Sequence, residues 1–248
     1  MFGGRKISSL KSLERWELFK IKSLEGMFRK CEFLNGLEGI ENWNLFSCKN
    51  IKDMFYQCKG IKSLVSLKYW DTSKIENMSR LFYGNDLESL QGLENWNLTK
   101  CINFNEIFKD CKLIEDLSPI KNWLIPKYQQ FSSTFRPMPI KINYGNLFGP
   151  SMNDEILKSM ASMFENCSSI KSVIPIENWE ITAFNNFNYL FKNCKSIEDF
   201  SPLSKWKFRS SKETTDIFVG TNQKGVNQVN IKVNIKGPNK KTYGNLFG

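Results

Sequence analysis

Trp70-Asp-Thr-Ser-Lys-Ile-Glu-Asn-Met-Ser-Arg-Leu-Phe82 begins with a tryptophan and ends, twelve residues later, with a phenylalanine. Every one of the seven tryptophans in the chain is followed by a phenylalanine at this spacing. The pairs are Trp16 and Phe28, Trp43 and Phe55, Trp70 and Phe82, Trp96 and Phe108, Trp123 and Phe135, Trp179 and Phe191, and Trp206 and Phe218. A fixed period in this size range indicates stacked repeats, each of which buries its apolar face against its neighbours.

The longest gap between neighbouring tryptophans, from Trp123 to Trp179, has room for one more unit. Phe164 lies inside this gap, and Met152 stands twelve residues before it, in the tryptophan position of a degenerate repeat. We therefore expect eight coils of about 27 residues, with eight buried phenylalanines in one column. These are Phe28, Phe55, Phe82, Phe108, Phe135, Phe164, Phe191 and Phe218.

Apolar residues follow one another in steps of three between these anchors, as in Phe55, Cys58, Ile61, Leu64, Leu67 and Trp70. A flat strand has a side-chain period of two, and an α-helix has a period of 3.6 residues. Neither element keeps a long run of triplets on one side, whereas a coil that turns corners does.

Local signals divide each coil into two expected elements. Asp71, Thr72 and Ser73 are typical N-cap residues, and Ser73 with Glu76 has the spacing of a capping box. We therefore expect a short helix or 3-10 turn in 75–82 and a short strand or extended piece through 64–67. The predicted fold is an α/β repeat solenoid, a leucine-rich-repeat-like stack of about eight 27-residue coils.

Two segments break the pattern. Residues 136–150 lose the triplets, and after Phe218 an alternation typical of a strand runs from Val229 to Ile235. Both segments end in Tyr-Gly-Asn-Leu-Phe-Gly, at 144–149 and at 243–248. We expect residues 1–149 to hold repeats one to five with an irregular closing module. Residues 150–248 then hold repeats six to eight with a C-terminal capping module, in one continuous solenoid.

The unit from Trp70 to Phe82 carries a family likeness, as does the Met-Phe-x-x-Cys, Leu-x-x-Leu and Asn-Trp pattern between Met27 and Trp43. The repeat resembles the BspA-type leucine-rich repeat family, whose bacterial members include surface proteins and mycoplasma lipoproteins. The resemblance covers roughly residues 7–218. It implies a leucine-rich type of solenoid used in adhesion or protein binding, and it implies no catalytic residue.

The composition argues against an enzyme. The chain has no histidine among its 248 residues, which excludes Ser-His-Asp and Cys-His catalysis and any histidine-ligated metal. Carboxylates recur beside the Asn-Trp pairs at Glu41, Glu94 and Glu177, where a solvated edge is favoured over an acid/base pair. We assign no catalytic, cofactor-binding or metal-binding residue, expect no cofactor, and name no binding residue.

The N-terminal sequence bears on location. Charged residues interrupt Met1 to Lys20, so no uninterrupted apolar region of a signal peptide fits there, and no lipobox is present. No apolar run approaches the ~18 residues that cross a membrane, so we expect no membrane insertion. The family resemblance implies a cell surface, but the chain as given favours an intracellular location.

The seven cysteines fall into two registers. Cys31, Cys58, Cys111, Cys167 and Cys194 each lie three residues after an anchor phenylalanine, and Cys48 and Cys101 lie five residues after a tryptophan. No Cys-x2-Cys pair is present, so a zinc ribbon is unsupported. Small buried hydrophobes with free thiols are the favoured interpretation. Bridges Cys31–Cys58 and Cys167–Cys194 stay open as an alternative, because adjacent coils lie within disulfide reach.

The net charge of +10 raises the question of an anionic partner. Two windows, 117–153 and 217–248, hold lysine and arginine without any carboxylate. Solubility and charged covers over the ends of the stack explain them more simply. We predict a non-enzymatic binding scaffold that presents an extended repeat surface to a protein or polymeric partner. A structural subunit that docks through its basic end modules, and a protein that binds nucleic acid or another polyanion, are the alternatives; the oligomeric state is not determined.

Overall fold

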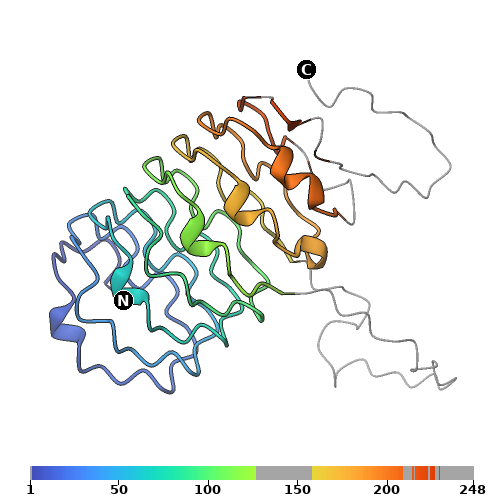
Figure 1. Ribbon diagram of the computed structural model, residues 1–248. Coiled ribbons are helices and arrows are strands. Elements are labelled where there is room, and N and C mark those ends of the chain that lie inside the picture. Colours follow the sequence, from blue (N-terminus) through green and yellow to red (C-terminus); the bar gives the residue numbers. More distant parts are fainter. Residues whose placement is uncertain are drawn as a thin grey trace, which may run out of the picture.

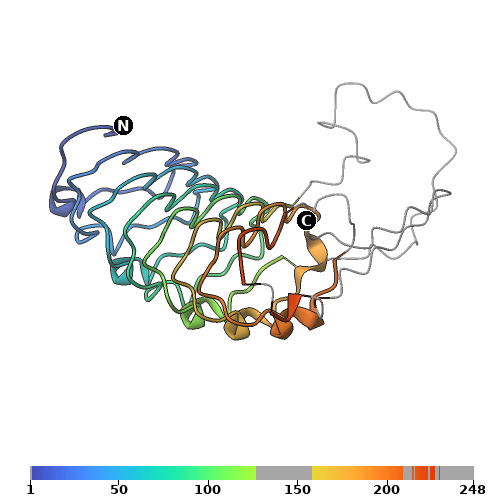
Figure 2. The same ribbon diagram turned by 90° about the horizontal axis from the view of Figure 1, so that it is seen from above.

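The computed structural model describes residues 2–126, 158–208, 214, 216–222, 224–226 and 229. In this part of the chain, successive coils lie side by side and form an elongated stack (Figure 1). Viewed from above, short helices follow one another along one long side of the stack (Figure 2). One hydrophobic core runs through the coils from Leu10 to Val229.

A column of phenylalanine rings forms the centre of this core. Neighbouring rings lie 5.5–6.2 Å apart between centroids and are nearly parallel. The column consists of Phe2, Phe28, Phe55, Phe82, Phe108, Phe164, Phe191 and Phe218. The predicted phenylalanine column is thereby confirmed for the seven predicted members that the structure describes, all of which are buried.

The predicted order of the columns, with Phe135 between Phe108 and Phe164 and Met152 between Trp123 and Trp179, was wrong. Phe108 stacks directly on Phe164, with centroids 6.0 Å apart, and Trp123 stacks directly on Trp179 at the same distance. No coil therefore lies between the coil of Phe108 and the coil of Phe164, although 56 residues separate the two rings in the sequence. Phe135 and Met152 themselves lie outside the described residues. The other end supplies a ring that the spacing missed, because Phe2 has no tryptophan before it.

The fold class was also predicted wrongly. In the described residues, pairing between coils amounts to isolated parallel bridges rather than strands, and the helices are short 3-10 helices. The elements also lie in reversed order within the coil. The 3-10 helix η2 (Val65–Leu67) occupies the segment expected to be a strand, and a bridge at Asn77 lies in the segment expected to be helical. An α/β solenoid of strands and helical turns is therefore not what this sequence forms.

The backbone conformation around each ladder phenylalanine explains why no helix forms there. Two residues before and two residues after Phe55, Asp53 and Gln57 have φ of 56° and 53°. A right-handed helix needs negative φ at every residue, so a left-handed residue every fourth position interrupts it. Both positions are left-handed in every coil from Phe28 to Phe218. They are Gly26, Lys30, Asp53, Gln57, Arg80, Gly84, Glu106, Asp110, Ser162, Asn166, Tyr189, Asn193, Asp216 and Gly220.

The hydrogen bonds of this segment compensate for the left-handed conformation. Alternate N–H groups, those of 51, 53, 55 and 57, donate to carbonyls of the next coil at 2.7–3.1 Å. The N–H groups of 54, 56 and 58 donate three residues back in the same coil. The N–H of Lys52 donates to Oδ1 of Asn50, the residue that forms the bridge. Every backbone donor from 51 to 58 is thus satisfied without a regular strand or helix.

The same four backbone hydrogen bonds join the coil of Phe108 to the coil of Phe164, although the long insertion after Trp123 separates these two coils in the sequence. The N–H groups of Phe104, Glu106, Phe108 and Asp110 donate to carbonyls in the coil of Phe164, at 2.9–3.1 Å. The coil that ends near Trp123 is therefore continued by the coil of Phe164 as closely as any neighbouring pair.

In most coils, short 3-10 helices form the turn before the tryptophan. They are η1 (Lys11–Leu13), η2, η3 (Ser118–Ile120), η4 (Ile174–Ile176) and η6 (Ser201–Lys205), whereas η5 (Ile181–Ala183) follows a tryptophan. Proline at the start of η3, η4 and η6 fixes φ for the turn. Two coils have a glycine with φ of 102° at the same position, Gly39 and Gly92.

Tryptophan and cysteine side chains join each coil to the one before. The indole Nε1 of Trp70 donates to the carbonyl of Ile40 at 2.8 Å, and the other tryptophans from Trp43 to Trp206 make the equivalent bond. The Cys58 Sγ donates to the carbonyl of Phe28 at 2.9 Å. The same thiol bond is made by Cys31, Cys111, Cys167 and Cys194. Tryptophan and cysteine each supply a side-chain hydrogen-bond donor that a purely apolar residue lacks, and this donor links the coil to the one before it.

Asn85 occupies the cysteine position in the coil of Phe82 and fits it poorly. It is fully buried; its Oδ1 accepts from the N–H of Cys58 at 2.8 Å, whereas its Nδ2 has no partner. A buried unpaired donor costs about 1–3 kcal/mol. We expect Asn85→Cys to raise the free energy of unfolding by about 1 kcal/mol, because a thiol there repeats the bond that Cys58 and Cys111 make. Urea unfolding measures the change, and an equal or lower midpoint contradicts it.

Several predictions of domain organisation lie outside the described residues. These are the boundary at 149 and 150, both Tyr-Gly-Asn-Leu-Phe-Gly modules and the alternation after Val229, so the division into 1–149 and 150–248 stays a prediction. The helix-capping prediction at residues 71–73 does not hold. Asp71 Oδ1 accepts from the N–H of Ser73 in a turn, and Thr72 Oγ1 donates to the carbonyl of Asn97 in the next coil.

Candidate functional site

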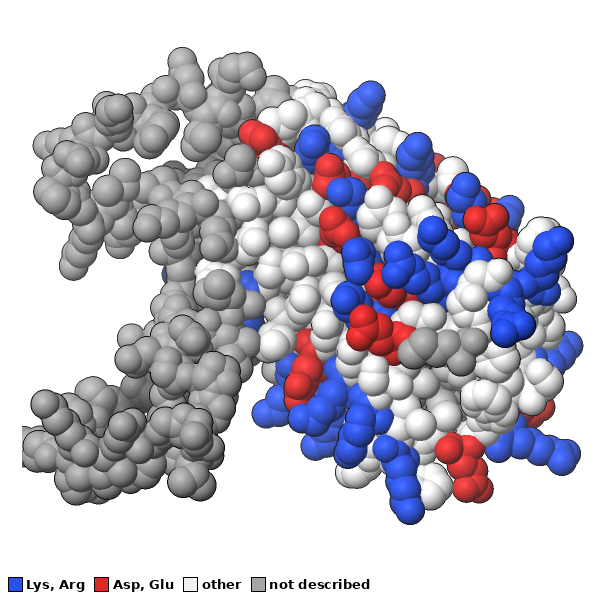
Figure 3. All heavy atoms as spheres, turned by 180° about the vertical axis from the view of Figure 1, so that it is seen from behind, with Lys and Arg blue, Asp and Glu red and all other residues white. Residues whose placement is uncertain are grey.

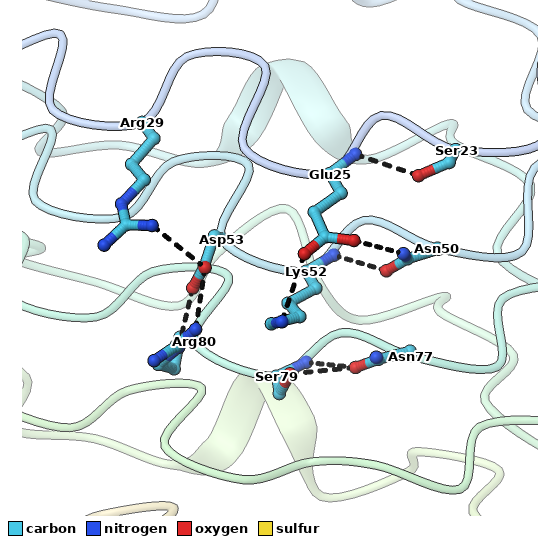
Figure 4. Close-up of polar contacts among 9 residues, drawn as sticks. All are labelled: Ser23, Glu25, Arg29, Asn50, Lys52, Asp53, Asn77, Ser79 and Arg80. Atoms are coloured by element: carbon cyan, nitrogen blue, oxygen red, sulfur yellow. Dashed lines mark hydrogen bonds and ion pairs between the residues drawn. The ribbon is translucent and has the colours of Figure 1, made fainter. Parts of the chain in front are cut away.

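One surface of the stack, which we call the ladder face, consists of the residues from five before to two after each ladder phenylalanine. Its polar side chains form a network across coils (Figure 4). Asp53, whose carboxylate is almost fully buried, accepts two hydrogen bonds from Arg80 at 2.7 and 2.8 Å and lies 3.6 Å from Arg29. Beside them, Lys52 pairs with Glu25 at 3.1 Å, and this bond lowers the pKa of Glu25.

The network continues toward the C-terminal coils. Lys109 pairs with the buried Glu165 at 2.8 Å, and Lys192 approaches the same carboxylate at 3.4 Å. Burial is the largest single influence on the pKa of Lys109 and lowers it, but the hydrogen bond to Glu165 and the charges of Glu165, Glu106 and Asp110 together outweigh burial and raise this pKa. Tyr83 stacks on Tyr56 with centroids 4.8 Å apart, and burial with the neighbouring Asp110 raises the pKa of Tyr83.

The charges of the ladder face largely neutralise one another. Lysine and arginine side chains are interleaved with aspartate and glutamate over the face drawn in Figure 3. An open hollow of about 280 Å³ lies on the ladder face, lined by Ser79, Arg80, Asn103, Asn105, Glu106, Ala161 and Ser162. Its arginine is already held by Asp53, so the ladder face offers a charge-balanced surface rather than a preformed ionic site.

The cysteines are structural in their surroundings. All seven are buried and free, which confirms the prediction of free thiols over the two bridges that stayed open. Burial raises the pKa of Cys58, Cys101 and Cys111 to about 12. A nucleophilic cysteine needs a lowered pKa and access to solvent, and these thiols have neither.

Thiol titration tests this arrangement directly. We expect the denatured, unreduced protein to react with about seven equivalents of a thiol reagent, in line with the composition. The native protein should react only as fast as it opens, because the thiols are buried. A count near three in the denatured protein would indicate that both Cys31–Cys58 and Cys167–Cys194 are bridged.

The raised thiol pKa values also predict a dependence of stability on pH. A thiol whose pKa is raised by folding favours the neutral form, so its contribution is fully present below the ordinary value of 9.0 and is lost as the pH rises toward 12. We expect the free energy of unfolding to fall between pH 9 and pH 11, by up to about 1.4 kcal/mol per pH unit for each such thiol. Cys111→Ala should show a shallower fall in the same urea series, and an unchanged slope contradicts the assignment.

The carboxylates beside the Asn-Trp pairs have local roles. Glu41 Oε2 accepts from the N–H of Gly39 at 2.7 Å, and Glu94 Oε2 accepts from the N–H of Gly92 at 2.9 Å. Glu177 pairs with Lys205 at 3.2 Å in the next coil. The structure therefore gives each of them a turn or ion pair to stabilise, and it brings none of them together with another as an acid/base pair.

A second open hollow, of about 410 Å³, lies next to the segments that contain the second and third tryptophans. Phe46 and Tyr69 line it with largely exposed rings, 59% and 78% accessible. The other lining residues are Glu41, Asn42, Trp43, Asn44 and Asp71. We call this the aromatic hollow. Because both of its rings are largely exposed, it is the candidate binding site in the described part of the chain.

Neither a metal-binding cluster nor a membrane-spanning helix is found among the described residues. They hold no group of three or more cysteine, aspartate or glutamate side chains placed to bind a metal ion. No helix among them is both long enough and apolar enough to span a bilayer.

Comparison with known proteins gives a family. The sequence profile of "Mycoplasma protein of unknown function, DUF285" matches residues 1–123, 62–143 and 118–232. The chain belongs to this family. The three matches overlap because a repeated unit aligns in more than one register. No curated protein matches the chain.

The sequence revealed only part of what this chain's repeat carries. The phenylalanine and tryptophan columns are evident from the spacing. The period alone does not reveal the aromatic hollow, because Phe46 and Tyr69 do not recur in every coil. Three residues after Trp96 and Trp179 the chain has threonine, and one residue before them it has asparagine. An aromatic residue at a position that is polar in several other coils is the signal that could have found the site.

Proposed function

We propose that this chain is a non-enzymatic binding scaffold that presents a rigid, repeated surface to a macromolecular partner. The observation that carries the proposal is the exposed aromatic row of the first coils. Phe19 and Phe46 stand three residues after consecutive stacked tryptophans, and Tyr69 lies beside Phe46 around the aromatic hollow. Large exposed rings that recur in register indicate a surface for recognition, since a monomer gains nothing from leaving them in water.

The rigidity of the stack supports this role. Four backbone hydrogen bonds at each interface from the coil of Phe28 to the coil of Phe191, together with the tryptophan and cysteine bonds, fix the spacing of equivalent side chains. The rings of Trp16 and Trp43, Trp43 and Trp70, Trp96 and Trp123, and Trp123 and Trp179 lie 6.0–6.4 Å apart, so exposed groups carried by these adjacent coils are held at a similar repeat. A pre-organised row of contacts loses little entropy when it binds an extended partner.

The resemblance of the repeat to BspA-type leucine-rich repeats supports an adhesive role for this DUF285 chain. Its two alternatives find less support. The basic end modules of the assembly alternative lie outside the described residues. The polyanion alternative needs an open basic surface, whereas many lysines are paired, as in Lys49 with Glu76 at 2.7 Å and Lys62 with Glu88 at 3.0 Å.

A capture experiment tests the proposal. The immobilised chain is exposed to an extract of its native host and to the cell-surface polymer fraction of that host, with and without an excess of the soluble chain. Saturable capture that the soluble chain competes away and that survives 0.5 M salt is the expected result. Loss of all capture between 0.05 and 0.2 M salt would favour a polyanion partner. Absence of capture, with concentration-dependent light scattering of the pure chain, would favour self-assembly and overturn the scaffold.

A further inference from the structure

The aromatic hollow combines ring faces with polar groups in one open depression. Phe46 and Tyr69 come from successive coils and line the same hollow. Asn44 Oδ1 accepts from the N–H of Phe46 at 2.9 Å, which fixes the turn that carries this ring. Asp71 Oδ1 accepts from the N–H of Ser73 at 3.0 Å, and this bond orients the carboxylate at the other side. The hollow is therefore built on a fixed framework, with both of its rings largely exposed.

We propose that the aromatic hollow binds a neutral glycan. One pyranose has a face of C–H groups that packs on an aromatic ring, while its hydroxyl groups pair with carboxylates and amides. The hollow supplies both kinds of partner: two exposed rings, and the side chains of Glu41, Asn42, Asn44 and Asp71 around them. Glu41 and Asp71 each use one oxygen in a turn, which leaves each carboxylate a second oxygen as an acceptor.

The size and openness of the hollow agree with a polymer rather than a small apolar ligand. Its volume of about 410 Å³ exceeds that of one sugar ring, and it lies open on the surface. A pocket for a small apolar ligand is enclosed and lined mostly by apolar side chains. Further along the row, Phe19 stands three residues after Trp16, which stacks on Trp43 at 6.4 Å. Phe19 thus offers another ring in the row, for a further sugar of the same glycan.

The charges around the hollow indicate a neutral ligand. Two carboxylates, of Glu41 and Asp71, line it. Two ammonium groups flank its rings: Lys74 Nζ lies 5.8 Å from the centre of the Phe46 ring, and Lys68 Nζ lies 5.5 Å from that of Tyr69. Because two negative and two positive charges balance, the site does not select for an anionic polymer. Binding should therefore change little with salt.

The chain provides its own control for the two rings. The position of Phe46 is occupied by Thr99 and Thr182 in other coils, and the position of Tyr69 by Asn95, Asn122 and Asn178. Phe46→Thr with Tyr69→Asn therefore converts the hollow into the surface that the stack carries elsewhere. Both side chains are largely exposed, so the double variant should unfold within about 0.5 kcal/mol of the parent. Phe33→Ser is the matched control, because it removes an exposed ring outside the hollow and places there the residue found at Ser169 and Ser196.

The experiment applies the labelled full chain to an array of immobilised oligosaccharides of three to six sugars, neutral and anionic, and then uses calorimetry with the neutral hexasaccharide retained most. The expected result is retention by neutral members at 0.5 M salt, with at least a tenfold loss of affinity in the double variant and no change in Phe33→Ser. Retention by anionic members only, no retention at all, or equal binding by the double variant overturns the glycan site.

The inference rests on the proposed scaffold function, but the two can fail separately. If the array retains nothing while the host extract yields competed, salt-resistant capture of a protein, the scaffold stands and the glycan site falls. If that captured protein is also lost with Phe46→Thr and Tyr69→Asn, the aromatic hollow is a protein-binding surface instead. If neither assay gives capture, both proposals fall.

Discussion

Replacing Phe108 by alanine is expected to lower the free energy of unfolding by about 3–5 kcal/mol, the usual cost for a buried phenylalanine. The Phe108 ring is fully buried, with its centroid 5.9 Å from that of Phe82, 6.0 Å from that of Phe164 and 6.2 Å from that of Trp123. It also stands at the interface that spans the long insertion. Because a stack of repeats is stabilised by contacts between neighbours, a cavity here weakens the coupling of the coils on either side.

Urea unfolding followed by tryptophan fluorescence measures this effect, and two further variants sharpen it. Lys62→Ala, whose side chain is exposed and pairs with exposed Glu88, should change stability by no more than about 0.5 kcal/mol. Phe135→Ala tests the order of the column, in which Phe108 stacks directly on Phe164 with no ring between them. Equal losses for Phe108→Ala and Phe135→Ala would restore the eight-coil frame that the sequence spacing predicts.

Gly92→Ala is expected to be the second most damaging substitution, with a loss of about 3 kcal/mol or more. Gly92 has φ of 102°, which only glycine adopts without strain. A Cβ there would overlap the carbonyl oxygen of Leu64 in the preceding coil and lie 2.8 Å from the Cα of Val65. These atoms belong to the backbone around η2, so they cannot move aside as a flexible side chain can.

The matched control is Gly36→Ala. The Cβ at Gly36 would meet only the carboxylate end of Glu38, which can rotate away, and its φ is not positive. We expect a change within about 0.5 kcal/mol. Thermal or urea unfolding of both variants checks the contrast, and a Gly92→Ala protein as stable as Gly36→Ala would show that the coils are not packed as closely as described.

The aromatic and triplet spacing was enough to predict what lies inside each coil. Phenylalanines such as Phe82, tryptophans such as Trp70 and cysteines such as Cys58 are all buried, as the register indicated. Burial can be read from sequence because it depends on the residue type and on its period. The local path could not be read in the same way. Ser73 and Glu76 have the spacing of a helix cap, yet Arg80 is left-handed and bonds to the next coil, so no helix forms.

The sequence by itself determined the repeat and most of the core residues, because both follow from the hydrophobic period, whereas it favoured free thiols but left two bridges open. Only the tertiary structure decided which coils are neighbours and which conformation each coil takes. Phe135 has the same sequence spacing as Phe108, but the stack places Phe164 against Phe108 because the two coils share the full set of backbone bonds. The left-handed turns have the same cause. Hydrogen bonds between coils offset the local backbone strain, which would not be stable in an isolated segment.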